Sequence, residues 1–343
     1  MSDSAKRIVK NSLIIAAFPL AMALIMEIWI LLAGADTHII TGVLDLQNIV
    51  RRTAISALIA YALSFNLTCG RMDLSLGAQR LAGVIIGGNL GLSLGLSGIG
   101  LLLFALLFGI LFGFVTGLLF VVTRVPAMVL GIGAGLIYEA LAFITSEGKG
   151  FNLFGTEGNG ILIDIWFTLG VIAVFIVLIL YILGFTRYGY RLRAIQGSQR
   201  IAKASGINVF TNAILSYTFA GGAVAVSGML DSAMSNGMKV ATGFMSNGTV
   251  MANMFPMFLG MYLARRSNQA VGIMVASLTL TLFALGLSKL ALNDAQQNVI
   301  TMLLFLLLLV YLANEDIFRR KRAEKARLQE ALRKKKSMLA MQA

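Results

Sequence analysis

The chain changes from fully apolar to strongly basic within one stretch, IWFTLGVIAVFIVLILYILGFTRYGYRLRAIQGSQRIAKASGINV (Ile165–Val209). Its first half belongs to an apolar run over about 163–185, which is long enough to cross the ~30 Å apolar core of a membrane as a helix. Its second half, from Arg191 onward, carries four Lys and Arg residues and no acidic residue. A basic segment directly after a membrane span predicts a loop on the cytoplasmic side.

Similar apolar runs recur along all 343 residues. The chain is 58% hydrophobic and only 13% charged, whereas soluble domains are roughly half apolar and about a quarter charged. We therefore predict an all-α, polytopic membrane protein with about ten transmembrane helices in a domain over 12–316. The predicted spans are 12–33, 53–69, 78–97, 99–122, 126–145, 163–185, 213–232, 248–264, 270–289 and 298–316.

The basic residues indicate the orientation. With both the N-terminal segment 1–11 and the tail 317–343 in the cytoplasm, most of the basic connections lie inside, as the positive-inside rule requires. These connections hold Arg71, Arg80, Arg124, the group Arg187 to Lys203, Arg265 and Arg266. The tail has ten Lys and Arg residues against two Glu between 319 and 336, and it follows an apolar run. We therefore interpret it as a cytoplasmic anchor that faces anionic membrane lipids, not as a nucleic-acid-binding segment.

Small residues and one proline indicate how the spans pack. Gly109, Gly113 and Gly117 form a GxxxGxxxG row, a spacing that lets the backbones of membrane helices approach closely. Pro256 interrupts the predicted span 248–264, because proline removes a hydrogen-bond donor and clashes with the preceding turn.

Residues for catalysis or metal binding are scarce. Cys69 is the only cysteine and His38 the only histidine, which excludes an intrachain disulfide, a Cys/His metal site and a histidine-based catalytic dyad within the membrane. No Walker lysine motif occurs. We predict that the chain is not an enzyme and binds no cofactor of its own, so the energy for uphill transport must come from an ion gradient or from another subunit.

Four ionisable residues lie in or near predicted spans: Glu27, Glu139, Asp231 and Lys289. Such residues are costly in lipid and often functional. An ion-coupled secondary transporter of a small polar solute is therefore the alternative function. Because the four residues lie on four separate spans, a packing role is the favoured interpretation.

The basic loop contains a predicted short helix. Ser198 is a suitable N-cap, Gln199 to Ser205 the helical stretch, and Gly206 a suitable stop in the left-handed conformation. Ile201 occupies the position where a capping box has Glu or Gln. A helix of fewer than two turns is unstable alone in water. It therefore needs a surface to pack against.

Three stretches resemble the permease subunits of ATP-binding-cassette (ABC) importers for monosaccharides, the ribose-type branch of a group that includes branched-chain amino-acid permeases. The loop resembles theirs at Tyr188, Gly189, Ala194, Ile195, Gly197, Ala202, Ser205, Gly206 and Ile207. The stretch CGRMDLSLGA is similar to their Gly-Gly-x-Asp-Leu-Ser-x-Gly element through Asp73, Leu74, Ser75 and Gly77. A weaker likeness includes Pro126 and Tyr138. Together these stretches run from about 53 to 232.

The resemblance implies a multi-pass subunit in a bacterial inner membrane that moves a sugar or sugar-like solute by alternating access. It also implies a cytoplasmic ATPase subunit, an extracytoplasmic solute-binding protein and a second permease subunit, as a homodimer or heterodimer. The loop 186–211 would hold the helix that couples to the ATPase, with Asp73, Ser75 and Gly77 in the pathway or its gate. The implied coupling residues are Gly197, Ser198, Arg200, Ala202, Lys203, Ser205 and Gly206.

Two departures from the family pattern point to a particular partner. The family usually has Asn followed by acidic residues where this chain has Ser198, Gln199 and Arg200. A glycine-rich element between the last spans is reduced here to Gly260 and Gly272. We therefore expect the groove of the partner ATPase to differ in charge from the grooves that the family's usual coupling helices fit. The reduced glycine element also suggests the hypothesis that this chain forms a heterodimer with a different permease.

Overall fold

The computed structural model describes residues 3–34, 37–156, 160–290, 292–315, 317 and 324. The chain divides into two units, Met1–Ala291 and Leu292–Ala343. Apart from residues 317 and 324, the predicted tail 317–343 lies outside the described residues. The structure therefore leaves its role as a lipid-facing anchor a prediction.

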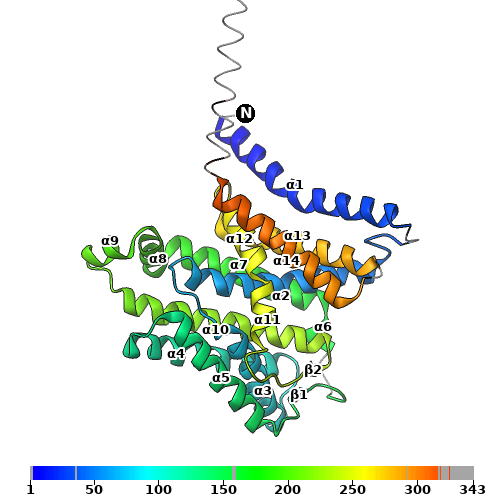
Figure 1. Cartoon of the computed structure of the whole chain (residues 1–343). Coiled ribbons are helices and arrows are strands. Elements are labelled where there is room, and N and C mark those ends of the chain that lie inside the picture. The colour runs from blue at the N-terminus through cyan, green and yellow to red at the C-terminus, as the bar shows by residue number, and fades with distance from the viewer. Residues whose placement is uncertain are drawn as a thin grey trace, which may run out of the picture. The chain divides into compact units, whose positions relative to one another are not determined.

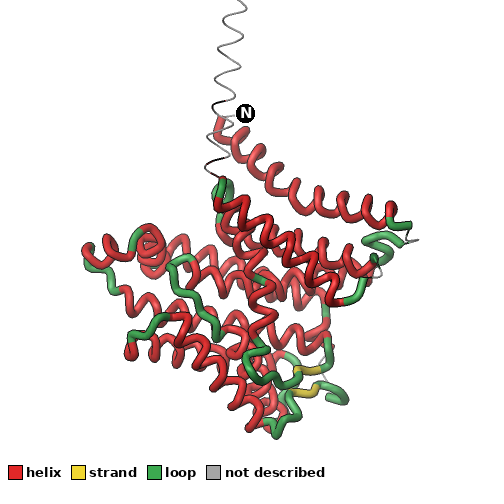
Figure 2. Tube along the Cα trace, in the orientation of Figure 1, coloured by secondary structure: helices red, strands yellow, loops and turns green. Residues whose placement is uncertain are grey.

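Helices form nearly all of the regular structure (Figures 1 and 2). The first unit runs from α1 to α13, and the second contains α14. The helices are α1 (Asp3–Leu32), α2 (Val43–Leu67), α3 (Leu76–Ser93), α4 (Ile99–Thr123), α5 (Ala127–Thr145), α6 (Gly160–Ile163), α7 (Ile165–Phe185), α8 (Arg187–Gly197), α9 (Gln199–Ala204), α10 (Val209–Met234), α11 (Asn247–Ala252), α12 (Met254–Ala264), α13 (Gln269–Lys289) and α14 (Asp294–Ala313).

Two short strands, β1 (Phe151–Asn152) and β2 (Gly237–Met238), form an antiparallel ribbon. Phe151 is opposite Met238, and Asn152 is opposite Gly237. The ribbon joins the connection after α5 to the connection after α10, although the two are more than eighty residues apart in the sequence.

Seven helices of the described chain, α1, α4, α5, α7, α10, α13 and α14, are long and apolar enough to cross a membrane. The prediction of an all-helical, polytopic membrane fold is confirmed. Three of the ten predicted stretches are not among the seven. The helix α2 carries Arg51 and Arg52 in its first half, α3 contains Gln79, Arg80 and Asn89, and the stretch 248–264 is divided between α11 and α12. The ten-span layout and the cytoplasmic location of both termini stay predictions.

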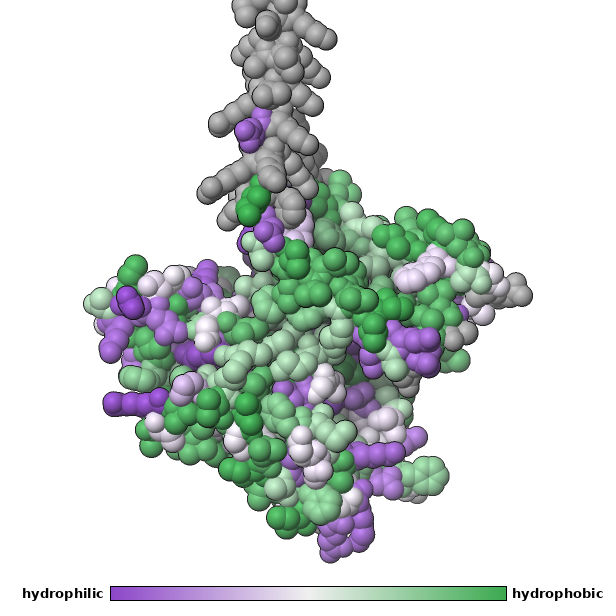
Figure 3. Space-filling model, viewed as in Figure 1, coloured by the Kyte–Doolittle hydropathy of each residue, from purple (hydrophilic) through white to green (hydrophobic). Residues whose placement is uncertain are grey.

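Large apolar side chains cover the outer faces of the spans. Leu107 on α4, Ile137 on α5 and Val177 on α7 are all more than half exposed. Figure 3 shows broad apolar areas, while hydrophilic residues gather at the end of the first unit where α8 and α9 lie. A surface of this kind is suited to lipid contact.

The core of the first unit is centred on α10, which packs against α2, α3 and α4. Glycines allow α4 and α10 to meet backbone to backbone. A Cβ atom added at Gly109 would lie 2.5 Å from the Gly221 carbonyl oxygen, and one at Gly113 would lie 2.4 Å from the Tyr217 carbonyl oxygen. The predicted role of this glycine row in helix packing is confirmed.

The predicted interruption near Pro256 is also present. The helix α11 ends at Ala252, Asn253 separates it from α12, and Pro256 lies in the first turn of α12. Proline is tolerated there because the N–H groups of a first helical turn have no partner within the helix.

We predict that Gly109→Val weakens the fold, because the added side chain has no space between α4 and α10. Overpacking of this kind costs roughly 1–3 kcal/mol. The purified variant should unfold at a lower temperature in detergent than the unaltered chain. Gly133→Val is the matched control, since a Cβ there meets nothing within 4 Å; equal unfolding temperatures for the two variants would contradict the close approach.

Candidate functional site

The loop between α7 and α10 folds into two helices, α8 and α9. Ser198 caps α9, accepting a hydrogen bond from the Ile201 amide (3.4 Å). At the other end, Gly206 has a φ of 77°. The Gly206 amide donates to the Lys203 carbonyl and the Ile207 amide to the Ala202 carbonyl, both at 3.1 Å. This is the Schellman arrangement, so the predicted cap, helix and glycine stop are confirmed.

The preceding helix, α8, was not predicted. The Thr186 hydroxyl caps it by accepting from the Gly189 amide (3.2 Å). Gly189 must be glycine, because a Cβ there would lie 2.3 Å from the Ile182 carbonyl oxygen. The fully or almost fully buried side chains of Leu192 and Ile195 hold α8 against the bundle.

The predicted coupling residues divide into two groups. Ala202 is only 2% exposed, so its contacts are with this chain itself. Ser198 is half-buried, and the others are exposed: Gly197, Arg200, Lys203, Ser205 and Gly206. Ile201, which the sequence comparison with the family did not single out, is 69% exposed. The exposed surface of α9 therefore carries one large apolar side chain, Ile201, and two cations, Arg200 and Lys203, which share a different face of the helix by their three-residue spacing.

Two glutamines connect this loop to the connection between α2 and α3. The Gln196 Nε2 atom donates to the Thr68 hydroxyl (2.8 Å), and the Gln199 Nε2 atom donates to the Cys69 carbonyl (2.6 Å). Next to them, Arg71 Nη2 and the Tyr188 hydroxyl both bond to the Ser216 hydroxyl, at 3.3 Å and 2.8 Å. Two of the three stretches that carry the family resemblance thus lie against each other.

The connection continues to Asp73, which is buried before the start of α3. Its carboxylate accepts from the Ser75 amide (2.9 Å) and the Ser75 hydroxyl (2.6 Å). Gln79 donates to the Ser75 hydroxyl (2.7 Å). Gly77 follows, and a Cβ there would lie 2.5 Å from the Ser246 carbonyl oxygen. The structure therefore joins Asp73 and Ser75 in one hydrogen-bonded cluster and brings Gly77 next to a distant part of the chain.

That distant part is the irregular segment 239–246 between β2 and α11. Glu139 of α5 is 1% exposed. Its carboxylate accepts from the Phe244 amide (2.7 Å) and the Ser246 amide (2.9 Å). Phe244 has a φ of 71°, a conformation that is costly for a non-glycine residue. The carboxylate thus holds a strained piece of backbone in place.

The other ionisable residues of the spans have separate partners. Glu27 pairs with His38, Asp231 with Arg80, and the Lys289 ammonium lies 3.5 Å from the Asp45 carboxylate. No bond joins any two of Glu27, Glu139, Asp231 and Lys289, so in the described part of the chain they do not form an ion relay.

Arg80 was counted with the inside connections and also falls in the predicted span 78–97; the structure supports the span. Arg80 lies within α3, where its carboxylate partner on α10 stabilises the buried charge.

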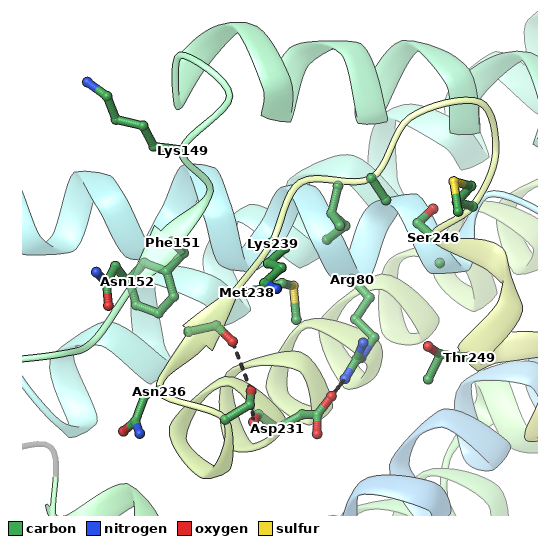
Figure 4. A pocket seen from close by; sticks show the side chains of 16 residues that line it. Arg80, Lys149, Phe151, Asn152, Asp231, Asn236, Met238, Lys239, Ser246 and Thr249 are labelled. Atoms are coloured by element: carbon green, nitrogen blue, oxygen red, sulfur yellow. Dashed lines mark hydrogen bonds and ion pairs between the residues drawn. The ribbon is translucent and has the colours of Figure 1, made fainter. Parts of the chain in front are cut away.

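A polar cavity of about 550 Å³ lies beside the Arg80–Asp231 pair (Figure 4). Its walls come from α3, β1, the end of α10, β2, the segment 239–246 and α11. At the rim, Lys149 donates to Glu147 (2.7 Å), which lowers the pKa of that carboxyl below its usual range. The sequence did not predict the cavity, because the residues that line it are far apart in the chain. Arg80 and Asp231, for example, are separated by 151 positions. Over the described residues, no three His, Cys, Asp or Glu side chains are placed to hold a metal ion.

Comparisons with known proteins agree on one family. Residues 46–312 match the family model described as branched-chain amino acid transport system / permease component. The ribose import permease protein RbsC of Bacillus subtilis (strain 168) is 29% identical over 199 residues, which cover 54% of this chain and 60% of that protein. RbsC of Escherichia coli (strain K12) is 23% identical over 273 residues, or 77% of this chain and 84% of that protein.

The match to the B. subtilis protein thus spans less than two thirds of its length. Among solved structures, the fold is similar to that of a transporter assigned to the metal-chelate type of ABC transporters, in an inward-facing conformation. The TM-score is 0.52 at 19% identity, over 89% of this chain and 99% of the other. This likeness supports the fold.

We predict that Glu139→Gln destabilises the chain. Glutamine keeps one carbonyl acceptor, but its NH₂ group faces the second backbone N–H, so one buried N–H loses its partner at a cost of about 1–3 kcal/mol. Thermal unfolding in detergent should show a lower midpoint. Glu147→Gln is the control, because its exposed ion pair contributes little; equal midpoints would show that Glu139 does not hold the segment.

Proposed function

Because this chain belongs to the family of branched-chain amino acid transport system permease components, we propose that it is the membrane-spanning permease subunit of an ABC importer for a sugar or sugar-like solute. Members of the family are non-catalytic membrane subunits, which agrees with the prediction that the chain is not an enzyme. Two relatives described as ribose import permeases support a sugar.

One observation carries the proposal: the coupling loop is bonded to the element that contains Asp73. The exposed side of α9 presents Ile201, and Arg200 and Lys203 share a neighbouring face by their three-residue spacing. This surface fits a groove with an apolar pocket and one acidic wall. The loop is fastened to Thr68 by Gln196 near the end of α8, and to the Cys69 carbonyl by Gln199 at the start of α9. A force on α9 therefore reaches the connection that leads to Asp73.

Transport then follows from rigid-body motion. When ATP closes the ATPase dimer, α9 moves with the ATPase surface, and the two glutamines transmit that displacement to residues 68–75. Gly77 in turn contacts the segment 239–246, which forms a wall of the polar cavity. Alternating access would arise when this wall and the start of α3 change position together.

The assembly that we propose has three further components. They are a cytoplasmic ATPase, an extracytoplasmic solute-binding protein and a second permease subunit, identical or different. The chain would lie in a bacterial inner membrane with its loop 186–211 and its tail 317–343 in the cytoplasm.

The docking surface is tested by Ile201→Glu. Burying an isoleucine contributes ~1.5–3 kcal/mol, so the amount of ATPase that co-purifies with the variant should fall about ten- to a hundred-fold. Phe154→Glu is the matched control, since Phe154 is an 83% exposed apolar residue outside the loop. Co-purification of the ATPase with Ile201→Glu at the normal yield would contradict the proposed docking role.

Uptake tests the class of transporter. Proteoliposomes that contain this chain with its proposed ATPase and solute-binding protein should accumulate a labelled monosaccharide only when ATP is supplied. An uncoupler should leave this uptake unchanged at constant ATP, because the energy does not come from an ion gradient. Uptake that collapses with the uncoupler would instead favour an ion-coupled transporter.

A further inference from the structure

We propose that the cavity beside Arg80 and Asp231 is a solute-binding station of the transport pathway, and that it takes a neutral, polyhydroxylated solute. The inference rests on the proposed import function and adds the location and the contacts of the solute. The cavity volume of about 550 Å³ lies within the ~300–1,000 Å³ range of small-molecule sites.

The ion pair at the cavity has an unusual arrangement. The Arg80 side chain is only 9% exposed, whereas the Asp231 side chain is 45% exposed. Arg80 Nε is buried and has no hydrogen-bond partner among the described residues. In Figure 4 the guanidinium and the carboxylate lie side by side at the cavity. A buried cation therefore stands next to an accessible carboxylate, and the two charges largely cancel.

This arrangement favours hydroxyl groups over other ligands. A hydroxyl both donates and accepts, so neighbouring hydroxyls of one solute can donate to Asp231 and accept from Arg80. An apolar solute would cover the pair without replacing its bonds to water. Two lysines also line the cavity: Lys149, which is paired with Glu147, and Lys239. A phosphorylated sugar is therefore the competing ligand, and ribose 5-phosphate represents it in the test below. The cavity also offers neutral polar side chains: Asn152, Asn236, Ser246 and Thr249.

The cavity shares part of its lining with a neighbouring hollow. Asp231, Ser235 and Thr249 line a second hollow of about 470 Å³, whose other walls include Ser56 and Asn253. The Ser56 hydroxyl donates to the Asn253 side-chain carbonyl (2.6 Å). A solute held at Asp231 thus has polar groups on both sides of it, as a station on a pathway requires.

Cysteine labelling tests the site. Cys69 is the only cysteine and it is buried, so Cys69→Ala provides a background into which Thr249→Cys is introduced at an exposed position of the cavity. The probes are D-ribose, D-galactose, ribose 5-phosphate and L-leucine, added to the reconstituted transporter before N-ethylmaleimide. A neutral sugar should slow modification of the new cysteine about fivefold at four times its dissociation constant. Ser97→Cys, exposed and outside the cavity, is the control and should show no protection.

The outcomes separate this inference from the proposed function. If the unaltered transporter imports D-ribose or D-galactose but neither sugar protects Thr249→Cys, the station is overturned and the import function stands. Protection by ribose 5-phosphate or L-leucine alone overturns the assignment to neutral polyhydroxylated solutes. ATP-driven import of L-leucine with no import of either sugar overturns both the proposed sugar importer and the solute class.

The ion pair itself is tested by Asp231→Asn. Loss of a charged acceptor costs about 1.5–3 kcal/mol, so the KM for sugar uptake should rise at least about tenfold. ATPase co-purification should stay unchanged, because Asp231 lies outside the coupling loop. An unchanged KM would overturn the role of the pair. The labelling experiment keeps the native pair and decides the location of the site even if this variant does not fold.

Discussion

Irregular backbone inside a membrane protein must find all of its hydrogen-bond partners within the protein, and the functional half of this chain depends on that constraint. Two irregular segments, 68–75 and 239–246, lie among the helices. Asp73 and the Asn66 carbonyl supply acceptors for the first, and Glu139 supplies acceptors for the second. Because the acceptors are charged or fixed by a helix, both segments are held at defined positions, where Gly77 lets them touch.

The acidic residues of the spans thus have structural partners that explain their presence in an apolar chain. Glu139 binds backbone, Asp231 neutralises a buried arginine, and Glu27 bonds to His38 and the Ile39 amide. A transporter driven by an ion gradient needs groups that exchange ions along a path. In the described residues these side chains are instead committed to separate contacts, which favours an external source of energy.

Features with a local cause were predictable from the sequence. Apolar length predicted the helices, and Ser198 and Gly206 predicted the ends of α9, because a cap and a left-handed stop act within one turn. The partners of Gln196, Gln199 and Glu139 were not predictable, since they lie more than a hundred residues away along the chain. The partner of Arg80 was missed for the same reason: Asp231, 151 residues away, stabilises a cation inside the helix that the predicted span 78–97 contains.

The glycine contact between α4 and α10 has a mechanical consequence. Helices that meet backbone to backbone have no layer of flexible side chains between them. The pair α4 and α10 therefore resists sliding and is expected to move as one rigid body. The turn at Asn253, by contrast, separates the short helices α11 and α12, and among the described residues its backbone bonds only to the adjoining turns, from the Asn253 amide to the Val250 carbonyl (3.1 Å) and from the Met257 amide to the Asn253 carbonyl (3.3 Å). Any bending of the first unit during a transport cycle would therefore concentrate between α11 and α12, next to the hollow that Asn253 lines. The α4–α10 pair would keep its shape.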